Sequence, residues 1–381
     1  MSTDSERYVF EAEWHDKMAC ITRKFLLYYY LTDNSVELFD VKTRKTFLRR
    51  TKCEGVDESN FYVGAVVTIF ARSMKLISFA DFSTKTRVSQ KIQKTLGIIM
   101  PDLHDKIGEM LKRILAENFK IGNLKMVHLS REDAMDFFRE KGDNSALMLN
   151  RITSGPILAL ELLGQDCISR WLEQIAPNEI SEVGEKDSST LRVFYEKEAG
   201  ENAFYGSSNE TAEQDVKFFF PDPMSEKREL PNTATITDCT CCIIKPHAVT
   251  SKLAGDIIDD IQKKGFLITA MQLFHVDPVN VEEFLEVYKG VLPDYGAMVA
   301  ELQSGPCIAM EIKRKDESVN VPVEFRKFCG PMDPEIAKHV RPDTLRAKYG
   351  KTKVQNAVHC SDLPEDGILE VQYFFKILSE S

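Results

Sequence analysis

The segment Ser154-Gly-Pro-Ile-Leu-Ala-Leu-Glu161 returns 150 residues later as Ser304-Gly-Pro-Cys-Ile-Ala-Met-Glu311. The offset grows along the chain from 145 to 155 residues, as expected when loops lengthen within a retained framework. The sequence therefore predicts two similar repeats, each of domain size. Four further pairs of segments match in the same order: Ile98-Ile-Met-Pro101 with Ile243-Ile-Lys-Pro246, Thr190-Leu-Arg192 with Thr344-Leu-Arg346, Asn202-Ala203 with Asn356-Ala357, and Val216-Lys-Phe-Phe-Phe220 with Val371-Gln-Tyr-Phe-Phe375.

The second repeat shows the clearest alternation of strands and helices. Ile257, Ile258 and Ile261 recur at helical spacing, and Gly265 is placed to end that helix. The order is βαββαβ-like, which predicts an α+β fold in which each tandem repeat is a ferredoxin-like sheet backed by helices. Apolar patterns predict strands at 241–245, 266–274 and 307–312, and further helices at 281–288, 295–302 and 371–378.

The N-terminal region has a different pattern, which predicts a β domain. Tyr8, Phe10, Ala12 and Trp14 alternate with other residues, as a half-buried strand requires. Helical periodicity is hard to find, so a small barrel or sandwich is expected. Further strands are expected at 25–31, 36–41, 66–70 and 76–79, with a turn at 32–35.

The chain thus divides into four parts. A β domain covers residues 1–90, and the first repeat covers 94–221. A linker at 222–238 carries prolines among charged residues, and the second repeat covers 239–378.

Composition is that of a globular protein and disfavours several classes. Hydrophobic residues make up 43% and charged residues 28%. No apolar run reaches the ~20 residues of a membrane span, and the polar N-terminus lacks a signal-peptide core, so an intracellular protein without a membrane partner is expected. Residues 1–93 hold 15 Lys and Arg against 12 Asp and Glu, a net charge of +3. The remaining residues have a net charge of −13, so the whole chain has −10. This acidic body argues against nucleic-acid binding.

Nine cysteines are too few for a disulfide scaffold. Cys239, Cys241 and Cys242 cluster, which raises the possibility of a metal site. No second cysteine pair and no histidine pair stand nearby at zinc-finger spacing, so reduced thiols around a buried strand are favoured.

The segment Asn356-Ala-Val-His359-Cys-Ser361-Asp362 holds the residues most suited to chemistry. A lone histidine is usually structural, and that alternative stays open for His359. Its imidazole is a competent nucleophile when neutral, provided that an acceptor such as Glu370 holds the right tautomer. Phosphoryl transfer also needs positive charge around the transferring oxygens. Suitable cations and a hydroxyl lie elsewhere in the repeat, at Lys245, Tyr288, Arg326 and Arg346.

These motifs resemble the nucleoside diphosphate kinase family, whose Lys-Pro-Asp, Ser-Gly-Pro and Asn-x-x-His-Gly-Ser-Asp segments have counterparts over 239–378 and, more weakly, over 94–221. The resemblance implies that His359 takes the γ-phosphoryl group from a nucleoside triphosphate and passes it to a diphosphate. The reaction would be ping-pong through phosphohistidine, with Mg²⁺ held by the phosphates and not by protein ligands. Ser361 and Glu370 would orient the histidine, and the nucleotide would contact Lys245, Tyr288, Arg326, Arg346 and Asn356.

The second repeat departs from the family pattern in four places. Cys360 replaces the glycine that usually follows the histidine, and Met332 stands where a phosphate-binding threonine is expected. Asp294, with Tyr295 beside it, takes the place of the aromatic residue that stacks on the base. The segment 330–346 is three residues longer than usual. These departures bear on nucleotide affinity and turnover.

The first repeat lacks most of these site residues. Met100 replaces the lysine and Tyr205 replaces the histidine, while Arg192 and Asn202 remain. A methionine cannot hold a phosphate, and a tyrosine cannot replace imidazole as a readily reversible carrier. We therefore expect the first repeat to serve as a packing partner for the second, so that the pair mimics a dimer within one chain. The alternative is that the first repeat still binds nucleotide through Arg192. Leu172 and Phe138 take the approximate positions of the first arginine and the tyrosine.

Residues 6–90 resemble the DM-ten domain of ciliary axoneme proteins, a pleckstrin-homology-like β-barrel. The resemblance rests on Arg7-Tyr-Val-Phe10, Ser35-Val-Glu-Leu-Phe-Asp-Val41 and Lys45-Thr-Phe-Leu-Arg-Arg-Thr51. The resemblance to kinase-family members with this architecture spans nearly the whole chain. It implies a protein of the cytoplasm and cytoskeleton, inside ciliary or flagellar doublet microtubules and at centrosomal γ-tubulin ring complexes.

Two functional hypotheses therefore stand side by side. In the first, the second repeat is a phosphotransferase. In the second, the kinase folds are structural modules of a microtubule protein. A run of basic residues in the β domain could then face acidic tubulin, and the alternative for this run is a strand edge protected by charge. The run comprises Lys42, Arg44, Lys45, Arg49, Arg50 and Lys52.

Overall fold

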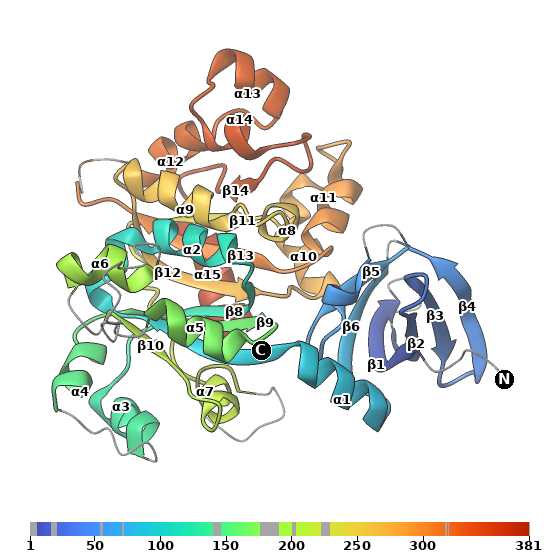
Figure 1. Cartoon of the computed structure of the whole chain (residues 1–381). Coiled ribbons are helices and arrows are strands. Elements are labelled where there is room, and N and C mark those ends of the chain that lie inside the picture. Colours follow the sequence, from blue (N-terminus) through green and yellow to red (C-terminus); the bar gives the residue numbers. More distant parts are fainter. Residues whose placement is uncertain are drawn as a thin grey trace. The chain divides into compact units, whose positions relative to one another are not determined.

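The computed structural model of the chain forms two compact units (Figure 1). The head unit comprises residues 1–92 and 275–306, and the sheet unit comprises residues 93–274 and 307–381. The residues that the structure describes are 6–16, 21–53, 56–70, 72–139, 146–175, 190–199, 203–221, 229–316, 318 and 320–380.

The head unit contains a curled antiparallel sheet of six strands. They follow the order β4-β3-β2-β1-β6-β5, and the long β1 pairs with both β2 and β6. Its core includes Tyr8, Phe10, Tyr29 and Phe61, all fully buried, with the rings of Tyr29 and Phe61 stacked at 4.1 Å. The expected β domain is confirmed. The strands are β1 (Arg7–Asp16), β2 (Ile21–Tyr30), β3 (Ser35–Asp40), β4 (Lys45–Lys52), β5 (Val66–Ile69) and β6 (Arg72–Phe79).

A helix in the head unit was not predicted from the sequence. Helix α1 (Phe82–Lys91) follows β6, and the side chain of Asp81 caps it by accepting the Thr84 N–H at 2.7 Å. Among its described side chains, Val88 is the only buried apolar one, which is too little to produce an apolar periodicity.

The head unit also includes three helical segments from inside the second repeat. They are α10 (Pro278–Phe284), the one-turn η4 (Glu286–Tyr288) and α11 (Tyr295–Leu302). The helix expected at 281–288 is therefore broken into two pieces. The hydroxyl of Thr68 in β5 donates to the carbonyl of Ser304 at 3.2 Å, which links this segment to the curled sheet.

The sheet unit is built on one antiparallel sheet of eight strands, in the order β10-β7-β9-β8-β12-β13-β11-β14. The first four strands come from the first repeat and the last four from the second, in mirrored order, so each half has the ferredoxin-like order that the sequence predicts. The halves meet where Lys125 of β8 pairs with Gln272 of β12. The strands are β7 (Gln93–Ile99), β8 (Lys120–Val127), β9 (Ile157–Gly164), β10 (Phe204–Gly206), β11 (Thr240–Ile244), β12 (Leu267–Phe274), β13 (Cys307–Lys313) and β14 (Val358–Cys360).

Helices pack around this sheet. In the first repeat they are η2 (Pro101–Lys106), α2 (Ile107–Ala116), α3 (Arg131–Phe138), α4 (Ala146–Ile152), α5 (Cys167–Ile175), α6 (Leu191–Ala199) and α7 (Ala212–Phe219). In the second they are α8 (Pro246–Thr250), α9 (Ala254–Lys263), α12 (Val321–Cys329), α13 (Pro334–Val340), α14 (Leu345–Tyr349), α15 (Asp366–Gln372), the π-helical η5 (Tyr373–Ile377) and α16 (Leu378–Glu380).

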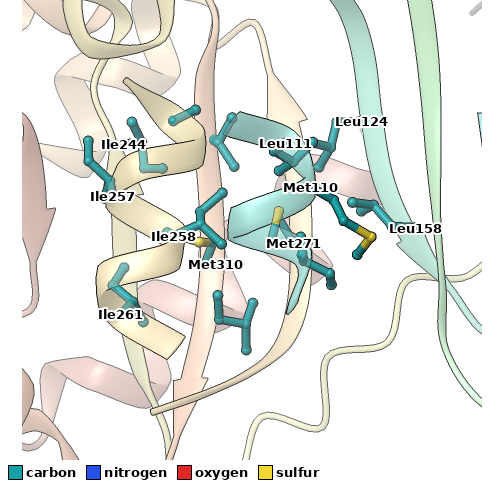
Figure 2. Packing of buried hydrophobic residues seen from close by; sticks show 14 of the residues in the cluster. Met110, Leu111, Leu124, Leu158, Ile244, Ile257, Ile258, Ile261, Met271 and Met310 are labelled. Carbon is teal, nitrogen blue, oxygen red and sulfur yellow. The ribbon is translucent and has the colours of Figure 1, made fainter. Parts of the chain in front are cut away.

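The two repeats share one hydrophobic core. Met110 and Leu111 of α2 belong to the same buried cluster as Ile257, Ile258 and Ile261 of α9 (Figure 2). Each such side chain stabilises the fold by about 1.5–3 kcal/mol when fully buried. The two halves of the sheet unit are thus joined by core packing as well as by the strand pair.

Glycines let the two helices approach closely. A Cβ on Gly108 of α2 would lie 2.1 Å from the Asp259 nitrogen of α9, and one on Gly255 of α9 would lie 2.3 Å from the Lys112 nitrogen of α2. The two glycines are 147 residues apart, within the repeat offset. The crossing is therefore a pseudo-twofold contact between equivalent helices.

The cysteine cluster at the start of the second repeat belongs to a buried strand. Cys241 and Cys242 lie in β11, and Cys239 just before it is also buried. Burial raises the pKa of the Cys239 thiol to about 12, so it stays protonated at neutral pH. Within the described part of the chain, no helix is both long and apolar enough to span a membrane.

Candidate functional site

The segment 354–362 lies at the end of the sheet and carries the histidine. His359 sits in β14, opposite Ile243 of β11. Just before the strand, Ala357 has a φ of 71°, and the Val358 N–H donates to the Asn356 carbonyl at 2.9 Å. This is a tight γ-turn around a residue in a left-handed conformation, which costs of the order of 1–3 kcal/mol without glycine.

His359 is held by a carboxylate on the helix that follows. Its Nε2 lies 2.9 Å from Oε2 of Glu370 in α15, and the Ser361 hydroxyl donates to the same oxygen at 2.7 Å. Ser361 in turn accepts the Cys241 N–H of β11 at 3.3 Å. In a neutral ring the Nε2 proton faces the carboxylate, so the lone pair of Nδ1 is the nucleophilic one.

The electrostatic setting of His359 favours its protonated form. Burial lowers the pKa of the imidazole, but the charge of Glu370 and the hydrogen bond to it outweigh burial, so the pKa is raised. The Lys245 ammonium acts in the opposite direction and lowers it. The ring thus lies near both an anchoring carboxylate and a cation.

Three basic residues predicted for the site all contact this segment. Lys245, at the end of β11, donates from Nζ to the Val354 carbonyl at 2.9 Å. Arg346 of α14 donates from Nε and Nη2 to the Val358 carbonyl, each at 3.2 Å. Arg326 of α12 pairs with Asp362 at 3.2 Å and also bonds its carbonyl. The three cations therefore contact the histidine segment, and their binding of phosphates stays a prediction.

Arg346 also braces the site. Its guanidinium is buried and donates to the Gly330 carbonyl at 3.0 Å as well as to Val358. Gly330 ends α12 with a φ of 83°, and a Cβ there would lie 2.3 Å from the Thr344 hydroxyl oxygen. These contacts hold α12, α14 and β14 together. Phosphate binding by Arg346 stays a prediction.

Asn356 is buried with one polar atom unused. Its Nδ2 donates to the Met332 carbonyl at 3.1 Å, whereas its Oδ1 is buried and accepts no hydrogen bond within the described structure. Because an unmade buried hydrogen bond costs about 1–3 kcal/mol, such an atom suits a ligand hydroxyl. Met332 contributes its backbone here, while its side chain is partly exposed.

Tyr288 is the predicted nucleotide contact that the sheet unit does not contain. It lies half-buried in η4. The exposed Asp294 and the half-buried Tyr295 of α11 belong to the same head unit. The role of Tyr288 in nucleotide binding stays a prediction.

Comparison with known proteins shows which family the chain resembles. The profile of the nucleoside diphosphate kinase family matches residues 93–224 and 238–378, and that of the DM10 domain matches residues 1–83. The chain belongs to the nucleoside diphosphate kinase family. It is 45% identical to nucleoside diphosphate kinase homolog 7 of Rattus norvegicus over 98% of this chain and 94% of that protein, and 44% identical to the homologue from Mus musculus over the same shares. A crystal structure of the Aquifex aeolicus nucleoside diphosphate kinase is 32% identical over 37% of this chain and 96% of that chain, with a TM-score of 0.34.

Cys360, which departs from the family's glycine, points into the same cluster. Its Sγ lies 3.7 Å from Nη2 of Arg346. A hydrogen bond with Cys329 lowers the pKa of the Cys360 thiol, and although burial opposes this, the charges of Arg346 and His359 reinforce it. Where glycine would have no side chain, Cys360 therefore supplies a hydrogen-bond acceptor for the Arg346 guanidinium.

His247 was not predicted as a site residue, although it follows Lys245-Pro246 where the family has aspartate. It is buried in α8, and its Nε2 accepts the Ala357 N–H at 3.2 Å. Its position directly after the family's Lys-Pro motif was the available signal.

The first repeat contains a carboxylate network like the one around His359. Tyr205 of β10 donates its hydroxyl to Asp215 of α7 at 2.9 Å, and the Ser207 hydroxyl donates to the same oxygen at 2.6 Å. Burial, reinforced by Asp215, raises the pKa of the Tyr205 phenol, so it is not ionised at neutral pH. The carboxylate network of the second repeat is therefore reproduced with tyrosine in place of histidine.

Apolar side chains fill the first site. Met100, in the place of Lys245, is fully buried, and its N–H donates to the Ala203 carbonyl at 3.0 Å as that of Lys245 donates to Ala357. The rings of Phe137 and Phe138 pack against Tyr205 at 5.3 and 6.0 Å. Arg192 lies half-buried in α6 and Leu172 in α5, while Asn202 falls outside the described residues.

Proposed function

We propose that the second repeat transfers a phosphoryl group from a nucleoside triphosphate to a nucleoside diphosphate through phosphohistidine at His359. The observation that carries the proposal is the His359–Glu370 contact at 2.9 Å, on a segment bonded by Lys245, Arg326 and Arg346. The carboxylate sets the tautomer, and the cations offset charge on the transferring oxygens.

The reaction proceeds in two balanced halves. The Nδ1 lone pair of His359 forms a bond to the γ-phosphorus, and the bond from that phosphorus to the bridging oxygen breaks, so that the diphosphate leaves with the electron pair. The acceptor diphosphate then attacks the phosphohistidine by the reverse path. Throughout, Glu370 holds the Nε2 proton and stabilises the positive charge that develops on the ring.

Nucleotide binding follows from the same residues. In this proposal the unused Oδ1 of Asn356 accepts a ribose hydroxyl, and Lys245 and Arg326 bind the phosphates. Among the described residues, no group of three or more His, Cys, Asp or Glu side chains could hold a metal ion. We propose that a divalent ion such as Mg²⁺ enters with the phosphates and neutralises part of their charge.

A two-nucleotide assay tests the transfer. Purified full-length protein with Mg²⁺, ATP and GDP should form GTP, and variant His359→Gln should form none. Phe284→Leu, a change in α10 of the head unit, is the control for effects of mutation and purification that do not involve His359. If wild type forms no GTP while its circular dichroism shows a folded protein, phosphoryl transfer to nucleotides is refuted.

We also propose a structural role for the chain in the cytoplasm and cytoskeleton, at the doublet microtubules of the cilium or flagellum and at centrosomal γ-tubulin complexes. Two observations favour it. In the first repeat, Met100 and Tyr205 stand at the positions of Lys245 and His359, and the rings of Phe137 and Phe138 pack against Tyr205. The edge strand β4 and the hairpin before it expose cations, and within the described structure none of the following forms an ion pair: Lys42, Arg44, Lys45, Arg49 and Lys52.

Co-pelleting with taxol-stabilised microtubules tests this second role. Wild type and His359→Gln should bind equally, because the proposed contact is on β4. Charge removal at Lys45, Arg49 and Lys52 by glutamine should weaken binding by about tenfold or more if three charge contacts of about 0.5–1 kcal/mol each are lost. Equal binding by the triple variant would refute the β4 contact.

A further inference from the structure

The γ-turn before His359 is held at both polar groups of its central residue. The Ala357 carbonyl accepts the Lys245 N–H at 2.9 Å, and the Ala357 N–H donates to Nε2 of His247 at 3.2 Å. Both partners belong to the short segment Lys245-Pro246-His247, which leaves β11 and begins α8. The turn is thus clamped to the neighbouring strand end.

The position of this clamp connects two functional residues. Asn356, which the proposed function assigns to ribose, immediately precedes Ala357, and His359 follows two residues later. The left-handed conformation of Ala357 reverses the chain between them. A residue that stabilises this conformation therefore sets the distance and orientation between the ribose contact and the nucleophile.

The contact demands a particular form of the His247 ring. Because the backbone N–H donates, Nε2 must carry a lone pair and the ring proton must lie on Nδ1. An imidazolium has no acceptor and cannot make this bond. The family's aspartate at this position could also accept a hydrogen bond, so the chemistry that is retained is acceptance and not the side-chain type.

We propose that His247 is a positioning residue for phosphoryl transfer, which holds the Ala357 turn through its Nε2 acceptor and thereby aligns Asn356 with His359. The inference rests on the proposed function of His359. His247 contributes no atom to the reaction. Any side chain of similar reach that accepts a hydrogen bond should replace it, and an apolar side chain of similar size should not.

Three variants separate this role from simple packing. His247→Gln places an amide oxygen near the position of Nε2, whereas His247→Leu fills the space without an acceptor. Thr233→Val is the matched control, because it removes a single side-chain hydrogen bond, from Thr233 to the Thr269 carbonyl at 2.6 Å, elsewhere in the same unit. Each full-length variant is labelled with γ-³²P-ATP and Mg²⁺, and its maximal labelling rate, half-saturating ATP and thermal midpoint are measured.

The leucine variant should lose at least about tenfold in maximal labelling rate, the factor that a 1.4 kcal/mol rise in barrier produces. The glutamine variant and the Thr233→Val control should stay within about threefold of wild type, a rise of less than 1 kcal/mol. If the leucine and glutamine variants have the same labelling rate, whether both keep it or both lose it, the hydrogen-bond acceptor does not account for the role of His247 and the proposal is overturned. A loss in Thr233→Val equal to that in His247→Leu would overturn it too, because a general loss of stability would then explain both.

Hydrogen exchange distinguishes this result from failure of the proposed function. Peptides covering 354–362 should exchange faster in His247→Leu than in wild type, and His247→Gln should not differ. If wild type takes no label, the proposed function falls, and with it the catalytic part of this inference. Unchanged exchange in His247→Leu would refute the clamp itself.

Discussion

Tyr205 and His359 occupy the same position in the two repeats, each on the outermost strand of its half of the sheet and each bonded to a carboxylate from the helix that follows. The longer tyrosine meets the shorter aspartate, and the shorter histidine meets the longer glutamate. A serine completes both networks. The first repeat therefore keeps this network as a structural support after losing the nucleophile.

The filled first site predicts that restoring the histidine alone restores no chemistry. In a His359→Gln background, Tyr205→His should take up no acid-labile phosphate from γ-³²P-ATP, because Met100 offers no cation and the rings of Phe137 and Phe138 pack against this position. The change should also destabilise the chain by about 1–3 kcal/mol, since Asp215 loses a buried hydrogen-bond partner. Phosphate appearing on the new histidine would show that the site is open.

The raised pKa of His359 predicts an acid limb in the labelling rate. Only the neutral ring attacks phosphorus, so the rate should rise with pH through a value above the usual histidine pKa of about 6.5. In Glu370→Gln the raising influence is lost and burial dominates, so the limb should move to lower pH. The maximal rate should fall as well, because the amide holds the ring less firmly. A limb that moves to higher pH would contradict the assigned electrostatics.

A substitution at Asn356 should change nucleotide affinity with little change in the free energy of unfolding. Asn356→Leu removes the hydrogen bond to the Met332 carbonyl but also removes the buried, unused Oδ1. The two effects oppose each other, so the free energy of unfolding should change by less than about 1 kcal/mol. Half-saturating ATP should rise by about tenfold, which corresponds to one lost hydrogen bond of about 1.4 kcal/mol. Unchanged affinity would remove Asn356 from the ribose site.

The helix crossing in the sheet unit predicts a steric sensitivity at its glycines. Gly255→Ala should destabilise the chain by about 1–3 kcal/mol in urea denaturation, because its Cβ meets backbone atoms of α2 that cannot move aside. Gly164→Ala, whose Cβ would have its nearest neighbour at 3.6 Å, is the control and should change stability by less than about 0.5 kcal/mol. Equal effects of the two changes would mean that α2 and α9 are not in close contact.

The sequence predicted those features that depend on local pattern or on repetition. The strands at 241–245, 266–274 and 307–312 lie within one residue of β11, β12 and β13, because each is an apolar run with clear ends. Helix α1 was missed because it buries little apolar surface, and the helix expected at 281–288 is interrupted at Leu285. Both errors concern segments whose structure depends on contacts distant in sequence.

The candidate site was predictable to the same extent. The motif around His359 and the cations were identified from their types and from the resemblance to the nucleoside diphosphate kinase family, and the structure brings Lys245, Arg326 and Arg346 to one segment. The role of His247 was not visible, since it acts on a backbone N–H whose orientation depends on the φ of Ala357. Likewise, no sequence pattern shows that an amide oxygen of Asn356 is left without a partner.

The central claim is that His359 carries the phosphoryl group, and phosphopeptide mapping tests it most directly. Full-length protein is incubated with γ-³²P-ATP and Mg²⁺, digested at alkaline pH, and its labelled peptides are identified by mass spectrometry. The account predicts a single acid-labile, alkali-stable label on the peptide that contains His359, absent from His359→Gln. A wild type without label, or a label that persists in His359→Gln, would contradict it.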